Sequence, residues 1–313
     1  MISSVFGKRK PVNYVIVFTF VFALYWFVNL YTFNRRFEPN QLLFQTFVLG
    51  VLLFSIFVVN FIVKRIKVTN TNSFGILFYT MLLLIFPEVL ADNDAIFCSL
   101  FLLFANRRLL SLRSQKNVKL KIFDATLWVV VASFFYDWAL LFLILVYVGI
   151  AFYGTNNIRN WLVPLAGCFT GFIILIAILV LSNNMAYLSD HYIFDFTFNT
   201  SFFFGIGNST KYIAYFLITT IVGSITFVKL GITGLGRVTT LRLIAISFVL
   251  GMVLVILKST SQVAPIIITF FPSVIFINTF IESIRRDKIR EIAIILCVLM
   301  PFVVFVSDLL VDL

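Results

Sequence analysis

Long apolar runs separated by short polar segments make up most of this chain. A helix needs about 20 apolar residues to cross the hydrocarbon core of a bilayer. Eleven segments are candidates for such helices: 13–32, 41–63, 74–90, 93–106, 122–136, 138–154, 161–182, 211–228, 242–258, 262–280 and 291–308. The pattern predicts an all-α polytopic transmembrane helix bundle of about eleven spans, forming a single integral membrane domain over residues 1–313. Span 93–106 is short, and the sequence leaves open whether it crosses fully.

Acidic residues divide two of the longest apolar runs. Asp92 and Asp94 interrupt the first run, and Asp137 interrupts the second. A carboxylate at the centre of a bilayer would cost roughly 3 kcal/mol. Each run is therefore predicted to form two helices joined by a tight turn at the membrane surface.

Composition supports the same class of protein. Hydrophobic residues make up 61% of the chain and charged residues only 12%, whereas about a quarter of the residues in a soluble domain are charged. This excludes a water-soluble enzyme and a nucleic-acid partner. The three cysteines, Cys98, Cys168 and Cys297, lie singly in apolar runs, so we expect no disulfide framework and no zinc site. No motif indicates a cofactor.

The distribution of Lys and Arg predicts an orientation. With the N-terminus in the cytoplasm, 20 of the 24 Lys and Arg residues fall in cytoplasmic segments. Such a bias is typical of the cytoplasmic side of membrane proteins. We therefore expect a bacterial inner-membrane protein with a cytoplasmic N-terminus and a periplasmic C-terminus. Nine of the 13 acidic residues lie at or near the outer side: Glu38, Glu88, Asp92, Asp94, Asp137, Asp190, Asp195, Asp308 and Asp312.

Four cations are exceptions to the charge bias and form the first group of candidate site residues. They are Arg35, Arg36, Lys211 and Lys258. Arginine presents a planar pair of donors to a phosphate and lysine a point charge, so this group could bind the phosphate of an anionic lipid. The alternative is that these side chains contact lipid headgroups or form salt bridges.

The outer carboxylates form the second group. Glu38 follows Arg35 in NRRFEPN, Asp92 and Asp94 lie in PEVLADND, and Asp137 follows Tyr136. A carboxylate near the membrane surface could act as a general base, and Asp137 could contribute to substrate binding. The alternative is that these acids cap helices or pair with the outer cations. The single histidine, His191, is expected to be solvated or hydrogen-bonded.

One outer connection is much longer than the others. Residues 183–210 contain no Lys or Arg and are rich in aromatic residues. Phe194, Phe196 and Phe198 alternate with polar residues, which is typical of a strand. Beside a membrane, the same segment could lie in the interface as a surface helix. The sequence predicts an outer interfacial segment and leaves its secondary structure open.

Residues 74–182 resemble the membrane core of the GT-C glycosyltransferases. The likeness lies in PEVLADNDAIFCSLFLLFANRRLL, KIFDATLWVVVASFFYDWALLFLILVYVGIAFY and NIRNWLVPLAGCFTGF. The resemblance implies a GT-C-like arrangement and a substrate carried on a polyprenyl phosphate at the outer face. The chain also resembles an uncharacterised family of bacterial multi-span inner-membrane proteins, which implies no particular activity.

The GT-C resemblance implies roles for the candidate residues. Glu38 would be the base and Asp92 or Asp94 the second acid, with Arg35, Arg36, Lys211 or Lys258 in contact with phosphate. The chain departs from the family in its first outer loop, which has only about eight residues, and in lacking the large C-terminal periplasmic domain of many members.

Three classes of function remain open at this level. The first is a transferase, or a relative, that binds a lipid-linked sugar. The second is a non-catalytic subunit or scaffold of a cell-envelope complex, with a protein partner. The third, a transporter, is disfavoured because few ionisable residues lie at mid-span and no internal repeat is visible.

Overall fold

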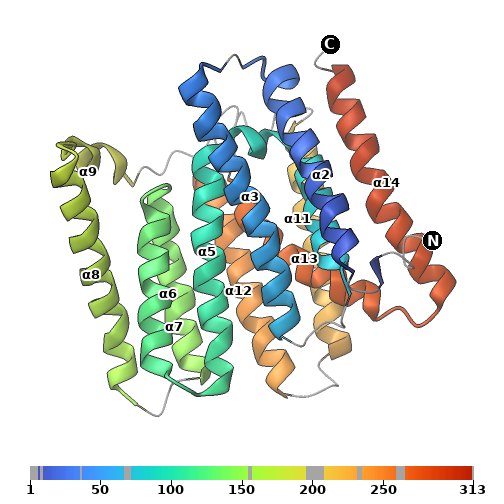
Figure 1. The fold of residues 1–313 in the computed structure, drawn as a ribbon. Helices are drawn as coiled ribbons and strands as arrows, with labels where there is room; N and C mark the ends of the chain where they lie inside the picture. Colours follow the sequence, from blue (N-terminus) through green and yellow to red (C-terminus); the bar gives the residue numbers. More distant parts are fainter. Residues whose placement is uncertain are drawn as a thin grey trace.

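The computed structural model describes residues 6–7, 10–35, 37–66, 72–153, 157–194, 208–230, 235–258 and 265–311. Within these ranges all regular secondary structure is helical, and the long helices run up and down between two ends of a bundle (Figure 1). The described chain thus confirms the predicted all-α class.

The two helices that follow Lys10 form a hairpin. Helix α2 (Pro11–Phe27) has a proline in its first turn and continues into a π-helical turn, η1 (Val28–Thr32). Proline suits a helix start because the N–H that it lacks would have no helical partner there. After a short connection, helix α3 (Pro39–Ile66) returns along the bundle.

The first divided run forms two helices, as predicted. Helix α4 (Phe74–Ile85) ends before Pro87, and the 3₁₀ turn η2 (Pro87–Ala91) follows. Helix α5 (Asn93–Ser111) begins at Asp92, whose carboxylate accepts a hydrogen bond from the Ala95 amide as an N-cap. Helix α5 and the following 3₁₀ turn η3 (Leu112–Ser114) extend well beyond the predicted end of this span.

The second divided run also separates at its aspartate. Helix α6 (Val118–Ser133) is followed by the 3₁₀ turn η4 (Asp137–Leu141) and by helix α7 (Phe142–Tyr153). Helix α8 (Arg159–Leu181) packs on α6, and the short helix α9 (Ala186–His191) follows it.

Four further helices follow in the described part of the chain: α11 (Asn208–Leu230), α12 (Leu235–Lys258), α13 (Ile267–Glu282) and α14 (Asp287–Val311). Helix α9 falls in the predicted outer segment 183–210, whose alternating aromatic stretch lies mostly outside the described residues.

Each of the eleven predicted segments contains a helix. Among the described residues, seven helices are long and apolar enough to cross a membrane: Pro11–Thr32, Pro39–Arg65, Asn93–Ser114, Arg159–Leu181, Thr210–Lys229, Arg237–Lys258 and Asp287–Leu310. The chain is therefore a membrane protein. Helices α4, α6, α7 and α13 are shorter.

Two of the short helices lie at the centre of the bundle. In α4 every residue except Ile85 is buried, and α13 packs against it. The rings of Tyr79 on α4 and Phe270 on α13 meet edge to face with their centroids 5.8 Å apart. By contrast, most side chains of α8 and α14 face outward.

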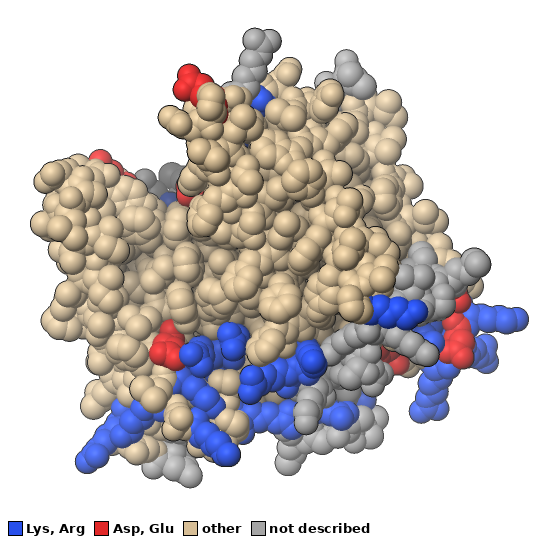
Figure 2. Space-filling view, in the orientation of Figure 1, with Lys and Arg blue, Asp and Glu red and all other residues tan. Residues whose placement is uncertain are grey.

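The two ends of the bundle differ in charge. Lys and Arg gather at the lower end in the view of Figure 2. We call this the basic end, which includes Arg65, Arg107, Arg108 and Lys121. We call the opposite end the acidic end, which includes Glu38, Glu88, Asp92 and Asp137.

Candidate functional site at the acidic end

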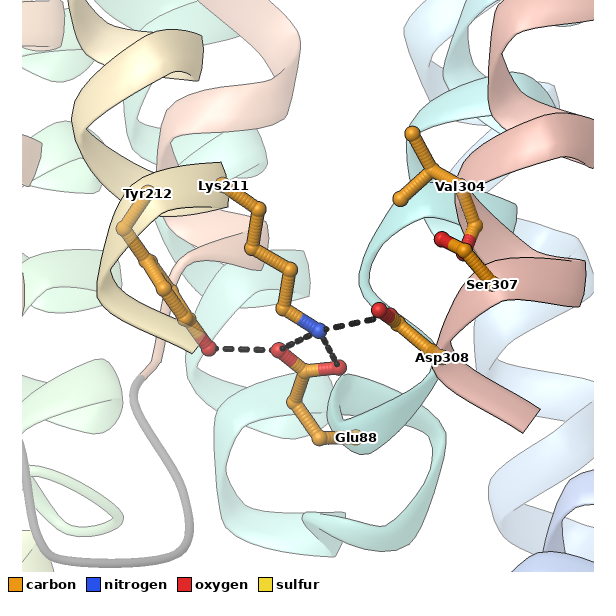
Figure 3. Close-up of polar contacts among 6 residues, drawn as sticks. All are labelled: Glu88, Lys211, Tyr212, Val304, Ser307 and Asp308. Carbon is orange, nitrogen blue, oxygen red and sulfur yellow. Dashed lines mark hydrogen bonds and ion pairs between the residues drawn. The ribbon is translucent and has the colours of Figure 1, made fainter. Parts of the chain in front are cut away.

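Lys211 lies at the centre of a charged cluster (Figure 3). Its Nζ atom is 3.2 Å from both carboxylate oxygens of Glu88 and 3.1 Å from Oδ2 of Asp308. The Tyr212 hydroxyl donates a hydrogen bond of 2.6 Å to Oε1 of Glu88. The cluster therefore joins η2, the first turns of α11 and the last turns of α14.

Because the side chains of Lys211 and Glu88 are mostly buried, the cluster stabilises the protein only when all of its charged partners are present. The Lys211 side chain is 13% exposed and that of Glu88 is 11% exposed. Removing charges from water is costly, and their mutual attraction repays that cost only when the geometry is good and other hydrogen bonds are made. With two carboxylates around one ammonium group, the charge of Lys211 is already compensated.

Lys258 forms a second pair. Its Nζ atom lies 2.9 Å from Oδ1 of Asp137, whose side chain is 1% exposed. The same oxygen accepts a hydrogen bond of 2.9 Å from the Trp138 amide. The other oxygen, Oδ2, has no hydrogen-bond partner among the described residues. The pair holds the end of α12 against η4.

Asp92 has structural partners for both oxygens. Oδ1 accepts from the Ala95 amide at 3.0 Å, and Oδ2 accepts a short hydrogen bond from the Tyr136 hydroxyl. Asp94 lies in the first turn of α5, where a negative charge favours the helix N-terminus. Both acids therefore stabilise the start of α5.

His191 connects α9 to the end of α6. Its Nε2 atom is 2.8 Å from the Ser133 carbonyl, to which it donates, and its Nδ1 atom is 3.1 Å from the Tyr187 hydroxyl. Tyr187 in turn donates to the Phe134 carbonyl at 2.6 Å. Burial, followed by the nearby charges of Asp94 and other groups, raises the pKa of Tyr187 to about 12.

Arg35 lies apart from these pairs, beside an open hollow of about 550 Å³. The hollow is lined by Arg35, Phe37, Asn40, Gln41, Phe44 and Gln45. The guanidinium of Arg35 approaches Oδ1 of the buried Asn29 at 3.5 Å and the Phe33 ring at 5.7 Å. Among the described residues it forms no ion pair.

Side-chain amides line the same hollow. Oε1 of Gln45 accepts from the Tyr25 hydroxyl, so its amide N–H groups remain as donors. Gln41 accepts from the Glu38 amide at 3.2 Å, which caps the start of α3. The Glu38 carboxylate is exposed and forms no ion pair with a described residue.

The structure thus separates the predicted site residues into four groups, two of which contain a salt bridge: Lys211 with Glu88, and Lys258 with Asp137. Lys211 and Lys258 form salt bridges with carboxylates of the acidic end, which is the alternative considered for these two cations. Arg35 and Glu38 share the connection between α2 and α3. Asp92 and Asp94 begin α5, and Arg36 lies outside the described residues. The predictions missed Tyr136, Tyr212 and the two glutamines, although the spacing of Gln41 and Gln45 places them on one helix face.

No group of three His, Cys, Asp or Glu residues in the described ranges could hold a metal ion. The cysteines are free, and Cys98 is buried.

Comparison of the chain with protein-family models, curated proteins and solved structures finds no significant match.

Proposed function

We propose that this protein binds the phosphate group of an anionic lipid at the Arg35 hollow, in the outer leaflet of a bacterial inner membrane. In this proposal each of the eleven predicted segments crosses the bilayer, including those that contain the shorter helices α4, α6, α7 and α13. The basic end faces the cytoplasm, in agreement with the usual excess of Lys and Arg on that side.

The observation that carries the proposal is that Arg35 has no carboxylate partner among the described residues. Lys211 and Lys258, the other described cations at this end, are neutralised by Glu88 or Asp137. A guanidinium that retains its charge can form a bidentate hydrogen bond with phosphate. The amides of Gln41 and Gln45 add donors around the same hollow.

The surface beside the hollow suits an apolar chain. The Phe44 side chain is 49% exposed and that of Phe47 is 61% exposed. Both rings contact Phe97 of α5, with centroid distances of 6.5 and 6.0 Å. Phe97 in turn stacks on Phe135 at 5.1 Å. A lipid with its phosphate at Arg35 could lay its chain along these rings.

The GT-C resemblance favours a polyprenyl-phosphate-linked sugar as the lipid. Transfer of the sugar would in addition need a base beside the phosphate, and Glu38 is the carboxylate on the same connection. A non-catalytic subunit of an envelope complex would use the binding step alone. Asp92 already has a structural partner for each oxygen, which favours the non-catalytic form.

The binding step can be tested with purified protein in detergent. Native mass spectrometry would compare a polyprenyl phosphate with the same polyprenol lacking phosphate. We expect the phosphate form to be retained, and Arg35→Gln to weaken it by at least about tenfold, because a charge-assisted hydrogen bond is lost. Arg113→Gln, an exposed cation at the basic end, is the control.

Equal retention of the polyprenol and its phosphate, or equal losses in the two variants, would contradict the proposal. Glu38→Gln separates transfer from binding. With a polyprenyl-phosphate-linked sugar and a hydroxyl acceptor as substrates, a variant that binds the donor lipid normally but no longer releases polyprenyl phosphate would identify a transferase, in which the base takes the acceptor's proton and the phosphate leaves. Release that is unchanged by the substitution, or absent from the unchanged protein as well, would favour the non-catalytic form.

A further inference from the structure

Four cations from three helices converge at the basic end. Arg65 lies in the last turn of α3, Arg107 and Arg108 lie near the end of α5, and Lys121 lies in the first turn of α6. None of these residues belongs to the lipid site proposed above, which is at the opposite end of the bundle.

A single aromatic ring holds two of these cations. The guanidinium carbon of Arg107 is 4.6 Å from the centroid of the Phe61 ring, and that of Arg65 is 5.7 Å from it. Cations are attracted to the face of an aromatic ring within about 6 Å of its centroid. Phe61 therefore brings together two guanidinium groups that would otherwise repel each other.

Counter-charges within this cluster are few. Arg108 pairs with Asp124 at 3.0 Å. Lys121 donates to the Ser111 carbonyl at 2.7 Å and to the Ser114 hydroxyl at 2.6 Å, both uncharged acceptors. Among the described residues, neither Arg65 nor Arg107 forms an ion pair. The cluster therefore retains several uncompensated positive charges.

The excess of positive charge affects the pKa of Lys121. Burial, and then the charges of Arg108 and Arg65, hold the pKa of Lys121 below its ordinary value. The general excess of cations on the cytoplasmic side requires only that they lie near that surface. It does not require two guanidiniums on one ring, with Arg107 half-buried.

We propose that Arg65, Arg107 and Lys121 form a site for the phosphate headgroup of an anionic phospholipid in the leaflet at the basic end. Basic pockets between membrane helices on the cytoplasmic side suit such headgroups. A lipid is favoured over a free phosphate because the neighbouring rings on α3, Phe54 and Phe57, are 48% and 49% exposed. They stack on each other at 6.4 Å and offer a surface for an acyl chain.

Native mass spectrometry of the full chain in a neutral detergent tests this site. The probes are phosphatidylglycerol, phosphatidylcholine, and inorganic phosphate as competitor. We expect phosphatidylglycerol to be retained more strongly than phosphatidylcholine. The double variant Arg65→Gln, Arg107→Gln should lose at least about tenfold of that preference, because two charge-assisted contacts disappear.

The control removes two charges from the same end without touching the cluster. Arg285→Gln with Arg286→Gln changes two cations in the connection between α13 and α14, and it should leave the preference intact. Equal losses in the two double variants would show a general charge effect and overturn the proposal. Inorganic phosphate that displaces the lipid at comparable concentrations would overturn the choice of a lipid.

A third variant distinguishes the loss of a binding site from misfolding of the protein. Phe61→Leu keeps every charge and a similar apolar volume but removes the shared ring. It should weaken phosphatidylglycerol binding while the thermal unfolding temperature stays close to that of the unchanged protein. Full binding in this variant would show that the ring does not organise a site. Arg35→Gln should leave this binding unchanged, which separates its outcome from that of the proposal at the acidic end.

Discussion

Charged residues at the acidic end illustrate what a sequence can reveal at the scale of single residues. The position of Lys211 next to an apolar run predicts that it lies at a membrane boundary. Its partner cannot be predicted from that pattern, since Glu88 is 123 positions away and several other carboxylates lie on the same side. The ion pairs were foreseen only as an alternative to a phosphate site.

The Lys211 cluster gives a prediction about stability. Lys211→Met would leave Glu88 and Asp308 as uncompensated carboxylates, one of them buried, and should destabilise the protein by about 3–5 kcal/mol. Asp308→Asn should cost less, because Lys211 keeps Glu88 and the pair is neutral. Thermal unfolding in detergent, followed by circular dichroism, would give the order of the two losses.

Two further variants check the cause of this effect. Adding Glu88→Gln to Lys211→Met should recover part of the loss, because one of the two stranded charges is removed. Lys119→Met, at an exposed cation of the basic end, should change little. A double variant less stable than Lys211→Met alone would contradict this electrostatic account.

At the scale of elements, helix positions followed from apolar runs, but some boundaries did not. The interruptions at Asp92 and Asp137 were predicted because a carboxylate is costly inside a bilayer. The end of α5 was placed too early, because the apolar run stops before Arg107 whereas the helix continues to Ser111. The apolar run ends where the predicted span leaves the hydrocarbon core, whereas the helical hydrogen bonds of the backbone continue to Ser111.

Close packing between α6 and α8 gives a second prediction. A Cβ atom added at Gly171 would lie 2.9 Å from Cγ1 of Val130, and valine has little rotamer freedom in a helix with which to move away. Gly171→Ala should therefore destabilise the protein by about 1–3 kcal/mol through overpacking. Thermal unfolding in detergent would measure the loss.

Gly50→Ala on α3 is the matched control. No atom lies within 4 Å of a Cβ added at Gly50, and alanine has the higher helix propensity, so this change should be neutral or slightly stabilising. If both variants unfold at the same temperature, the close approach of α6 and α8 does not contribute to stability.

At the scale of the whole molecule, the sequence could not show which helices are central. In a soluble protein the polar face of a helix marks the outside, but here lipid and core are both apolar. Helix α4 is buried whereas α14 mostly faces outward, although each is an apolar run. The position of the Arg35 hollow could not be predicted from the sequence either, because it depends on how α2 and α3 meet.

The orientation can be tested by cysteine labelling. In a background with Cys98, Cys168 and Cys297 replaced by Ala, cysteine would be introduced singly as Ser189→Cys or Lys116→Cys. These exposed positions lie at opposite ends of the bundle. A thiol reagent that cannot cross membranes should label Ser189→Cys in intact cells, and Lys116→Cys only after lysis. The reverse pattern would invert the proposed orientation.

The buried pair of short helices has a consequence for biogenesis. With 12 residues, α4 is about 18 Å long, less than the roughly 30 Å of a bilayer core. Its neighbour α13 is made much later, and Asn72 before α4 donates a hydrogen bond to Glu282 at the end of α13. A nascent chain that has reached only α8 therefore holds α4 without two of its main packing partners, α13 and α14, which the ribosome makes later.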